Sequence, residues 1–204
     1  MTAPGFVYLA SQSPRRRQLL EQIGVRCEML LAGAEEDAEA LEAVRAGDTP
    51  EVYVERVTRA KLRAARARRV ARGLAPAPIL CADTTVALGR RILGKPADAT
   101  DATRMLGLLS GRTHRVITAV AVAGPRRTRL LANTSRVRFA VLTAAQIARY
   151  IDSGEPFGKA GAYAIQSAAA AWIERIEGSY TGIMGLPLHE TAVLLQEAGL
   201  DVRP

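Results

Sequence analysis

The sequence predicts a mixed α/β fold, in which a twisted sheet is flanked by helices. Short apolar runs typical of buried strands alternate along the chain with helical segments. Two long strand-like segments also surround a turn at Gly124-Pro125, which predicts one long central hairpin. With 204 residues, 49% hydrophobic and 24% charged, the chain can form a single domain with a sizeable core, and no repeat or linker divides it.

Turn and capping residues delimit the elements of the first half of the chain. Ser-Pro and Thr-Pro pairs at 13–14 and 49–50 each place an N-cap before a proline in the first helical position, and Gly24 and Gly73 end the two helices that follow. The acidic segment 35–42 fits no pattern. The apolar runs predict strands at residues 6–10, 27–31 and 76–88, with a short return strand at 92–93.

The elements of the second half follow the same logic. A helix from 143 to 153 has Thr143 as its N-cap, and residues 155–179 are expected to be irregular because their alanine-rich part shows no clear period. The remaining elements are a helix at 99–109, the hairpin strands at 115–122 and 129–141, and a closing helix at 187–198 that ends at Gly199.

The formal net charge of +8 indicates an anionic partner, which could be nucleic acid, a membrane surface or a small polyanionic substrate. Only three of the 28 basic residues are lysines. In a chain so biased toward arginine, arginine is expected at every position where a lysine can be freely replaced. Lys61, Lys95 and Lys159 are therefore candidates for sites that need a compact ammonium group.

The two cysteines and the N-terminal residues indicate the cellular compartment in which the protein is expected. Cys27 and Cys81, without a secretory context, are expected to be reduced and buried, and they exclude a cysteine zinc cage. No stretch approaches the roughly 18 apolar residues of a membrane span, and the first residues lack the basic segment of a signal peptide. We expect a cytoplasmic protein without a membrane partner.

An anion site is predicted at residues 11–17, where a strand leads through a hydroxyl-rich turn into a helix start with three arginines. Free N–H groups and the positive end of the helix dipole favour an anion there. Arg15 and Arg16 can make bidentate phosphate contacts, and Arg17 is expected to face solvent. The alternative interpretation is an ordinary capped helix with solvated arginines.

Lys61, Asp83 and Lys95 form a second group of candidates. Lys61 falls on the helix face that also holds Val54 and Val57, where a lysine is costly unless it is paired or hydrated; a structural lysine that extends to solvent is the alternative. Asp83 interrupts an apolar strand, so it bonds within the fold, holds a metal or activates water. Lys95 follows the return strand, which brings it back toward Asp83. A carboxylate beside lysines and phosphate oxygens suits Mg²⁺-assisted phosphoryl chemistry.

Glycine-rich segments at 155–166, 178–180 and 185–187 fit a binding wall, because glycine lets the backbone approach a ligand closely; a surface loop is the alternative. His114, at a strand entry, fits a structural hydrogen-bonding role better than an acid–base role. No Walker A, Rossmann or HExxH pattern is present. A triad of Ser11, His114 and Asp83 would lack the nucleophile-elbow context.

In their order and spacing, these motifs resemble those of the Maf family of nucleoside triphosphate pyrophosphatases. The resemblance extends from Leu9 to Leu195 and is based on LASQSPRR, GAEED, the helical Lys61, CADTTV, GKP, LSGRTHRVITAV, KAGAYAIQ, EGSY and GLPL. It implies a two-lobed fold like that of inosine triphosphate pyrophosphatases, with residues 1–204 as one catalytic domain around a central cleft. It also implies a cytoplasmic enzyme that uses Mg²⁺ or Mn²⁺ and often forms a homodimer.

Family roles fall on individual residues of this chain. The resemblance implies that Asp83 is the active-site base, that Glu36 and Asp83 bind the metal, and that Lys61 and Lys95 assist catalysis. The positions that it assigns to substrate binding are Ser11, Ser13, Arg15, Arg16, Thr84, Lys159 and Gln166.

The KAGAYAIQ run resembles the family branch that acts on dTTP and UTP, not the branch that acts on 7-methyl-GTP. Arg15, Thr84 and Gln166 fall on positions linked to base selection. Three positions depart from the usual family pattern: Gly158 stands in place of Asp, Ser167 in place of Gly, and Gly182 in place of Asn.

The predicted reaction is attack of water on the α-phosphorus of a nucleoside triphosphate. Asp83 orients or deprotonates the water, and Lys61, Lys95, Arg15 and Arg16 neutralise the pyrophosphate that leaves. One alternative is a nucleic-acid-binding protein that uses the arginines of 56–72, but these spread around the helix and aromatic residues are scarce. The other is a cell-division regulator with little catalysis. We expect a nucleotide substrate and no nucleic-acid partner.

Overall fold

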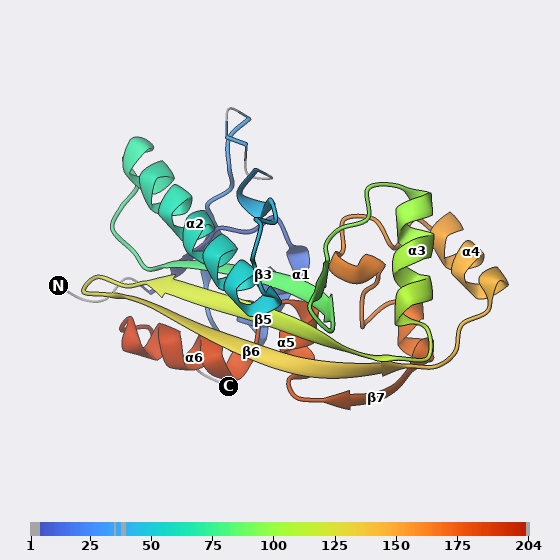
Figure 1. Cartoon of the computed structure of the whole chain (residues 1–204). Coiled ribbons are helices and arrows are strands. Elements are labelled where there is room, and N and C mark those ends of the chain that lie inside the picture. Colours follow the sequence, from blue (N-terminus) through green and yellow to red (C-terminus); the bar gives the residue numbers. More distant parts are fainter. Residues whose placement is uncertain (1–4, 35, 38–39, 203–204) are drawn as a thin grey trace.

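The computed structural model describes residues 5–34, 36–37 and 40–202 (Figure 1). In this part of the chain, seven strands form one mixed sheet in the order β2-β1-β3-β5-β6-β7, with β4 paired to β3. The predicted α/β class, a mixed sheet flanked by helices, is confirmed. The strands are β1 (Val7–Leu9), β2 (Cys27–Met29), β3 (Ile79–Leu88), β4 (Arg91–Leu93), β5 (Thr113–Ala123), β6 (Thr128–Phe139) and β7 (Ile173–Glu177).

Helices lie between and around these strands. The α-helices are α1 (Pro14–Gln22), α2 (Pro50–Ala71), α3 (Ala99–Leu109), α4 (Ala144–Asp152), α5 (Tyr180–Met184) and α6 (Leu188–Glu197). Three 3₁₀ turns complete the described elements: η1 (Ala40–Glu42), η2 (Ala160–Ala162) and η3 (Ala168–Trp172).

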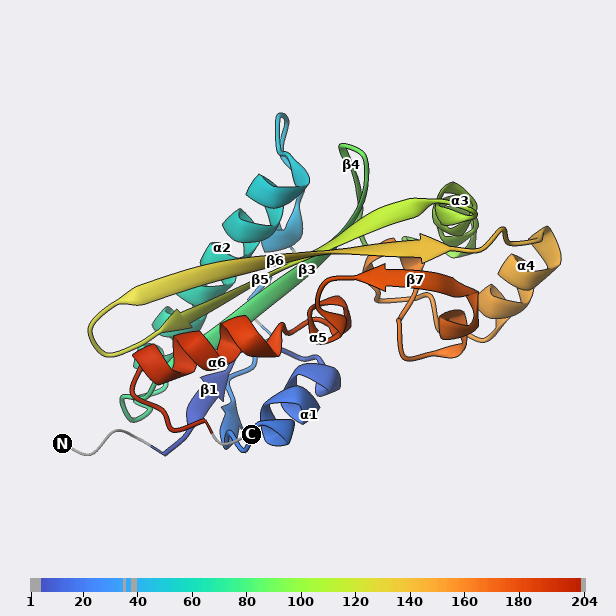
Figure 2. The ribbon, with the colours of Figure 1, turned by 90° about the horizontal axis from the view of Figure 1, so that it is seen from below.

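The sheet combines a short parallel part with a long antiparallel part. β1 lies parallel to β2 and β3, whereas β3, β5, β6 and β7 pair antiparallel. The predicted hairpin is confirmed: β5 and β6 pair from Thr113 opposite Arg138 to Ala123 opposite Thr128. This hairpin runs the length of the molecule, so elements at both of its ends are attached to one rigid support (Figure 2).

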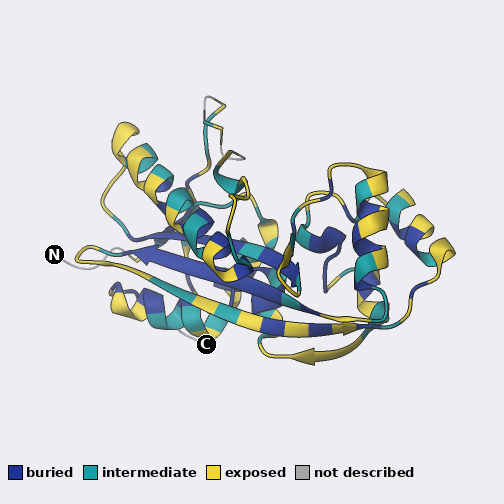
Figure 3. Ribbon diagram, viewed as in Figure 1, coloured by how far each residue is buried: buried dark blue, intermediate teal, exposed yellow. Residues whose placement is uncertain are grey.

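The core lies on both faces of the sheet because strand side chains alternate between them. Ile79 and Cys81 of β3 pack with α2, while Leu80 and Ala82 pack with α1 and α6 on the opposite face. A further cluster around Phe139 packs under α3 and α4 at the far end of the hairpin (Figure 1). In Figure 3, β3 and β5 are buried, whereas the outer sides of α2 and α3 are exposed.

Most helix boundaries follow the predicted capping residues. Thr49 Oγ1 accepts a backbone N–H at the start of α2, α3 spans the predicted residues 99–109, and Thr143 forms a reciprocal capping box with Gln146 at α4. Ser13 precedes α1 as predicted, but its side chain makes no capping hydrogen bond within the described part of the chain.

Residues 155–179 are more regular than the sequence predicted, since they contain η2, η3 and β7. β7 lies at the edge of the sheet and its last four residues, 174–177, are exposed, so it lacks the apolar alternation of a half-buried strand. α5 is one short helix of five residues, too short for a hydrophobic period. Within the acidic segment 35–42, residues 35, 38 and 39 lie outside the described part of the chain.

Both cysteines are free thiols. Cys81 is buried in β3, as predicted, but Cys27 is only half-buried because β2 is the other edge strand of the sheet. Among the described residues, no helix is both long and apolar enough to cross a membrane.

Candidate active site

A cleft of about 1160 Å³ brings together parts of the chain that are far apart in sequence. Its walls come from the loop between β1 and α1, from η1 and α2, from β3 with the segment after β4, and from residues 157–165 with the end of α5. Gln166 is exposed and does not line it. The predicted site residues that do line it are Ser11, Ser13, Arg15, Arg16, Glu36, Lys61, Asp83, Thr84, Lys95 and Lys159, so all three lysines of the chain face one cleft.

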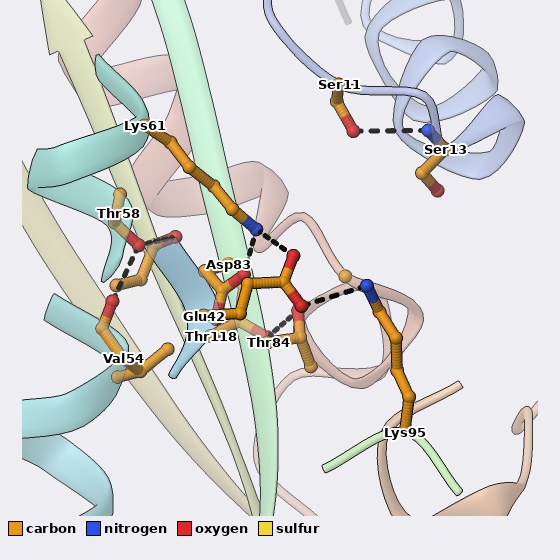
Figure 4. A network of polar contacts seen from close by, with 12 residues as sticks. Ser11, Ser13, Glu42, Val54, Thr58, Lys61, Asp83, Thr84, Lys95 and Thr118 are labelled. Carbon is orange, nitrogen blue, oxygen red and sulfur yellow. Dashed lines mark hydrogen bonds and ion pairs between the residues drawn. The ribbon is translucent and has the colours of Figure 1, made fainter. Parts of the chain in front are cut away.

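Lys61 links two carboxylates in the wall of this cleft (Figure 4). Its Nζ lies 2.6 Å from Asp83 Oδ1 and 2.7 Å from Glu42 Oε1. The other carboxylate oxygen of Glu42, Oε2, lies 2.8 Å from Lys95 Nζ. The sequence left open whether Lys61 is paired, hydrated or extended to solvent, and the structure shows it paired. The return strand β4 brings Lys95 into the same cluster, where its carboxylate partner is Glu42.

Asp83 is the most deeply placed member of this cluster. It lies in the middle of β3, opposite Ala119 of β5, and is 7% exposed. Burial raises the pKa of the Asp83 carboxyl, while the charge of Lys61 and its hydrogen bond oppose that shift. A carboxylate with a raised pKa, fixed by a strand and turned toward a cleft, suits proton transfer from water.

Glu42 was not predicted as a site residue. Burial alone would raise the pKa of its carboxyl, but the charges of Lys61 and Lys95 and the hydrogen bonds from them hold that pKa below its ordinary value. Glu42 belongs to the acidic segment that fitted no pattern, and nothing in its spacing from Lys61 relates the two. Its only sequence signal is an acidic charge in a strongly basic chain.

The loop after β1 is fixed by Arg16. The Oγ of Ser11 accepts hydrogen bonds from the backbone N–H of Ser13 at 3.2 Å and from Arg16 Nη1 at 3.1 Å. Arg16 also donates from Nε to the Gly185 carbonyl at 2.8 Å and from Nη2 to Thr84 Oγ1 at 3.4 Å. Arg16 therefore connects the loop to β3 and to the end of α5.

Arg15 and Arg17 differ as predicted. Arg15 lines the cleft and is half-buried, and burial lowers the pKa of its guanidinium. Arg17 is exposed and pairs with Glu21, four residues later on the same helix, at 2.8 Å. Arg15 thus lies at the cleft, and Arg17 faces solvent.

A chain of hydroxyl groups continues from Arg16 into the sheet. Thr118 Oγ1 donates to the Gly182 carbonyl at 2.8 Å and lies 2.9 Å from Thr84 Oγ1. Because the Thr118 proton is used on Gly182, the Thr84 hydroxyl donates to Thr118 and accepts from Arg16. The orientation of Thr84 at the cleft is therefore fixed by both neighbours.

The positions that depart from the family pattern have distinct surroundings. A Cβ on Gly182 would lie 3.0 Å from Asn133 Oδ1, so the packing there accommodates glycine more easily than asparagine. Gly158 has a φ of +73°, and no atom of the described residues lies within 4 Å of the position that a Cβ would take, so glycine leaves open space at the cleft. The Ser167 hydroxyl donates to the Ala164 carbonyl at 2.9 Å.

The wall formed by residues 157–165 packs closely on β3. Gly161 has a φ of +69°, and a Cβ there would lie 2.9 Å from Val86. The Lys159 ammonium donates to the Glu155 carbonyl; burial, together with the charge of Arg15, lowers the pKa of Lys159. Phe157 lines the cleft and is 41% exposed.

Glu36 lines the cleft but is bonded to an arginine. Its two oxygens accept from Arg68 Nε at 2.7 Å and Nη2 at 2.6 Å, and it also accepts from the Gly33 N–H. The Arg68 hydrogen bonds lower the pKa of Glu36 to about 2. Asp83 is thus bonded to Lys61, and Glu36 to Arg68. Among the described residues, no group of three or more His, Cys, Asp or Glu side chains could hold a metal ion.

His114 is part of the core. It is 1% exposed, its Nε2 lies 2.8 Å from the Tyr163 hydroxyl, and its ring makes edge contacts with Phe139 and Tyr163. Burial lowers the pKa of His114 to about 4, so the ring is neutral at pH 7. The structural role predicted for it agrees with these contacts.

Comparison with known proteins gives a consistent result. The family model described as Maf-like protein matches residues 6–198. A dTTP/UTP pyrophosphatase from Polaromonas sp. is 64% identical over 202 residues, which cover 99% of this chain and 100% of the relative. Proteins of the same name from Ralstonia nicotianae and Cupriavidus pinatubonensis are 64% and 62% identical. Both alignments cover 96% of this chain, and they cover 95% and 98% of the respective relatives. The chain therefore belongs to the Maf-like protein family.

Proposed function

We propose that this protein hydrolyses dTTP and UTP to the nucleoside monophosphate and pyrophosphate. The observation that supports this most strongly is the Lys61–Asp83 pair in a cleft lined by further cations, in a chain 60–64% identical to proteins named dTTP/UTP pyrophosphatase. The nucleic-acid-binding and purely regulatory alternatives have no comparable support.

The triphosphate binds to the basic side of the cleft. Arg15, Lys61 and Lys95 supply positive charge, and the Ser11 and Ser13 hydroxyls supply donors for phosphate oxygens. Before substrate arrives, Arg16 holds the loop that carries the two serines, and Asp83 holds Lys61. Preorganised cations stabilise the negative charge that accumulates on the leaving pyrophosphate, where electrostatic stabilisation has its greatest effect on rate.

Asp83 acts on the attacking water. Its carboxylate accepts the proton as the water oxygen bonds to the α-phosphorus, and the bond from that phosphorus to the bridging oxygen breaks. Lys61 keeps the carboxylate charged and in one orientation, since its Nζ lies 2.6 Å from Oδ1. The pyrophosphate leaves with the bonding electron pair.

A divalent cation, Mg²⁺ or Mn²⁺, would find two carboxylates in the cleft, although no group of three or more such ligands lies together among the described residues. Hard cations prefer carboxylate oxygens, and Asp83 and Glu36 are the residues that would hold it, with Glu36 released from Arg68. When bound, the ion supplies charge neutralisation to the phosphates.

The base faces the wall made by residues 157–165. Among the described residues, three aromatic side chains line the cleft. Tyr53 and Tyr163 are buried and their hydroxyls are hydrogen-bonded, whereas the ring of Phe157 is partly exposed. Phe157 is therefore suited to stack on a pyrimidine, and Thr84 and Lys159 to contact its polar groups. Gln166 would need to turn toward the cleft to assist.

We also propose a homodimer in the cytoplasm that binds no nucleic acid and contributes to nucleotide-pool cleaning, with an effect on cell division. The two free cysteines are consistent with a reducing compartment.

The test is pyrophosphate release from a panel of natural and modified nucleoside triphosphates, with and without Mg²⁺ or Mn²⁺. We expect dTTP and UTP to be the best substrates, and Asp83→Asn to reduce kcat by at least about 100-fold, the scale of general base catalysis. Circular dichroism checks that the variant is folded. Near wild-type turnover in folded Asp83→Asn would contradict the mechanism, and salt-sensitive DNA binding without turnover would support the rival class.

A further inference from the structure

We propose that Glu42 is an internal competitor of the substrate, whose carboxylate occupies Lys61 and Lys95 in the free protein and leaves them when phosphate oxygens arrive. This inference rests on the proposed function for the identity of the ligand. It concerns a residue for which the sequence provided no role.

The geometry of Glu42 resembles that of a bound phosphate group. One of its oxygens lies 2.7 Å from Lys61 Nζ and the other 2.8 Å from Lys95 Nζ, so a single anion joins two ammonium groups from different elements (Figure 4). Two oxygens of a phosphate can make the same pair of contacts. Substrate and Glu42 therefore compete for the same donors.

Of the two carboxylates on Lys61, Glu42 is the one free to move. Asp83 is fixed in the middle of β3 and its side chain is 9% exposed, whereas the Glu42 side chain is 25% exposed and belongs to the short turn η1. If Glu42 swings away, Lys61 keeps Asp83 as a partner. The positive charge of Lys95 is then available to the ligand.

The movement needs no change in the main chain. The Glu42 carbonyl accepts a hydrogen bond from the Tyr53 hydroxyl at 2.9 Å, and the neighbouring Ala43 carbonyl accepts one from Arg56 at 2.9 Å. Both donors lie on α2, so the backbone of this segment is anchored. Rotation about the side-chain bonds of Glu42 is sufficient to clear the two lysines.

The test measures binding of inorganic pyrophosphate by isothermal titration calorimetry, in the presence of a chelator so that metal binding does not contribute. Glu42→Gln keeps the shape of the side chain and removes its charge, and Glu42→Ala removes the carboxylate entirely. We expect both to lower the Kd for pyrophosphate by about tenfold, because the competing ion pairs are lost. Glu42→Asp keeps the charge but is too short to reach both lysines, and its Kd should fall between.

Glu55→Gln is the matched control, since it removes one negative charge from α2 outside the cleft and should change the Kd by less than about twofold. An unchanged or higher Kd in folded Glu42→Gln and Glu42→Ala would overturn the proposal, because it would mean that Glu42 only positions the lysines. Turnover of dTTP and UTP is measured separately: its absence in the wild type contradicts the proposed function, while the change in Kd still decides the role of Glu42.

Discussion

Lys61 serves two carboxylates with one ammonium group, and this explains why a lysine persists there in an arginine-rich chain. Its Nζ lies 2.6 Å from Asp83 and 2.7 Å from Glu42, so the charge is concentrated at one point between them. A planar guanidinium distributes its donors over a larger fork and is not interchangeable with that point charge. The scarcity of lysine made Lys61, Lys95 and Lys159 candidates for the site, and all three line the cleft.

We predict that Lys61→Arg lowers kcat/KM for dTTP by about 100-fold, because the guanidinium displaces Asp83 from its orientation. Steady-state pyrophosphate release measures the effect. Arg59→Lys, on the same helix and exposed, is the control that should retain activity. Full activity in Lys61→Arg would show that the site needs no compact ammonium.

Phe157 gives a prediction that separates base binding from phosphate binding. Phe157→Ala should raise the KM for dTTP by roughly 5- to 150-fold, the range for loss of one stacking contact. Inorganic tripolyphosphate has no base, so its inhibition constant should change little. Val70→Ala, which removes an exposed apolar side chain of α2 outside the cleft, should alter neither value. Equal changes for both ligands would argue against base stacking.

At the scale of single elements, the sequence predicted those that depend on local signals better than those that depend on pairing with a distant strand. The starts of α2 and α4 follow from Thr49 and Thr143, whose hydroxyls accept backbone N–H groups as the capping rule requires. β7 could not be found in this way, because its strand conformation depends on pairing with β6 and four of its five residues are exposed. Local rules describe residues close in sequence, whereas an edge strand is defined by a distant partner.

The residues of the candidate site differ in the same way: some could be recognised from their local sequence, and others only from contacts that the fold creates. Asp83 was conspicuous because a carboxylate in an apolar strand needs a partner. Glu42 and Thr118 were not, because each acquires its role only when the fold brings it to another element. Gln166 was expected at the cleft by resemblance, yet the turn that follows η2 leaves it exposed.

Two glycines with different surroundings allow a prediction about the stability of the protein. Gly161→Ala should lower the free energy of unfolding by about 2 kcal/mol or more, because the new Cβ would lie 2.9 Å from Val86 and the backbone has a φ of +69°. Gly107→Ala in α3, where a Cβ would meet no other described residue within 4 Å, should stabilise the protein by about 0.5–1 kcal/mol. Urea unfolding measures both, and a neutral Gly161→Ala would contradict the close packing.

At the scale of the whole molecule, the hairpin β5–β6 holds the two ends of the structure in a fixed relation (Figure 2). β3, which bears Asp83, pairs along β5, and the cluster under α3 and α4 includes residues of β5 and β6. The cleft walls therefore depend on a shared sheet and not on one local loop. Whether residues 1–204 behave as one cooperative domain stays a prediction that calorimetric unfolding can test.

His114 makes the stability of the whole molecule depend on pH. Burial lowers the pKa of His114 from 6.5 to about 4, so between these values the unfolded chain binds a proton that the folded chain does not. The free energy of unfolding should therefore fall by up to about 3 kcal/mol as the pH decreases from 6.5 to 4. Urea unfolding at pH 7.5 and 4.5 measures this loss, and His114→Gln should lack it.

His189→Gln is the control for that experiment, because His189 is exposed on α6. This variant should lose as much stability on acidification as the wild type. An equally large loss in His114→Gln would mean that other groups account for the pH dependence.

The placement of every lysine in one cleft has a practical chemical consequence. Apart from the terminal amine of the chain, Lys61, Lys95 and Lys159 are the only primary amines that an acylating reagent can modify. Amine-directed labelling, crosslinking or coupling to a sensor surface would therefore act at the cleft and at the terminal amine, and not at random over the exterior. A bound nucleotide should shield the protein from such reagents, so the rate of acylation would report directly on ligand occupancy.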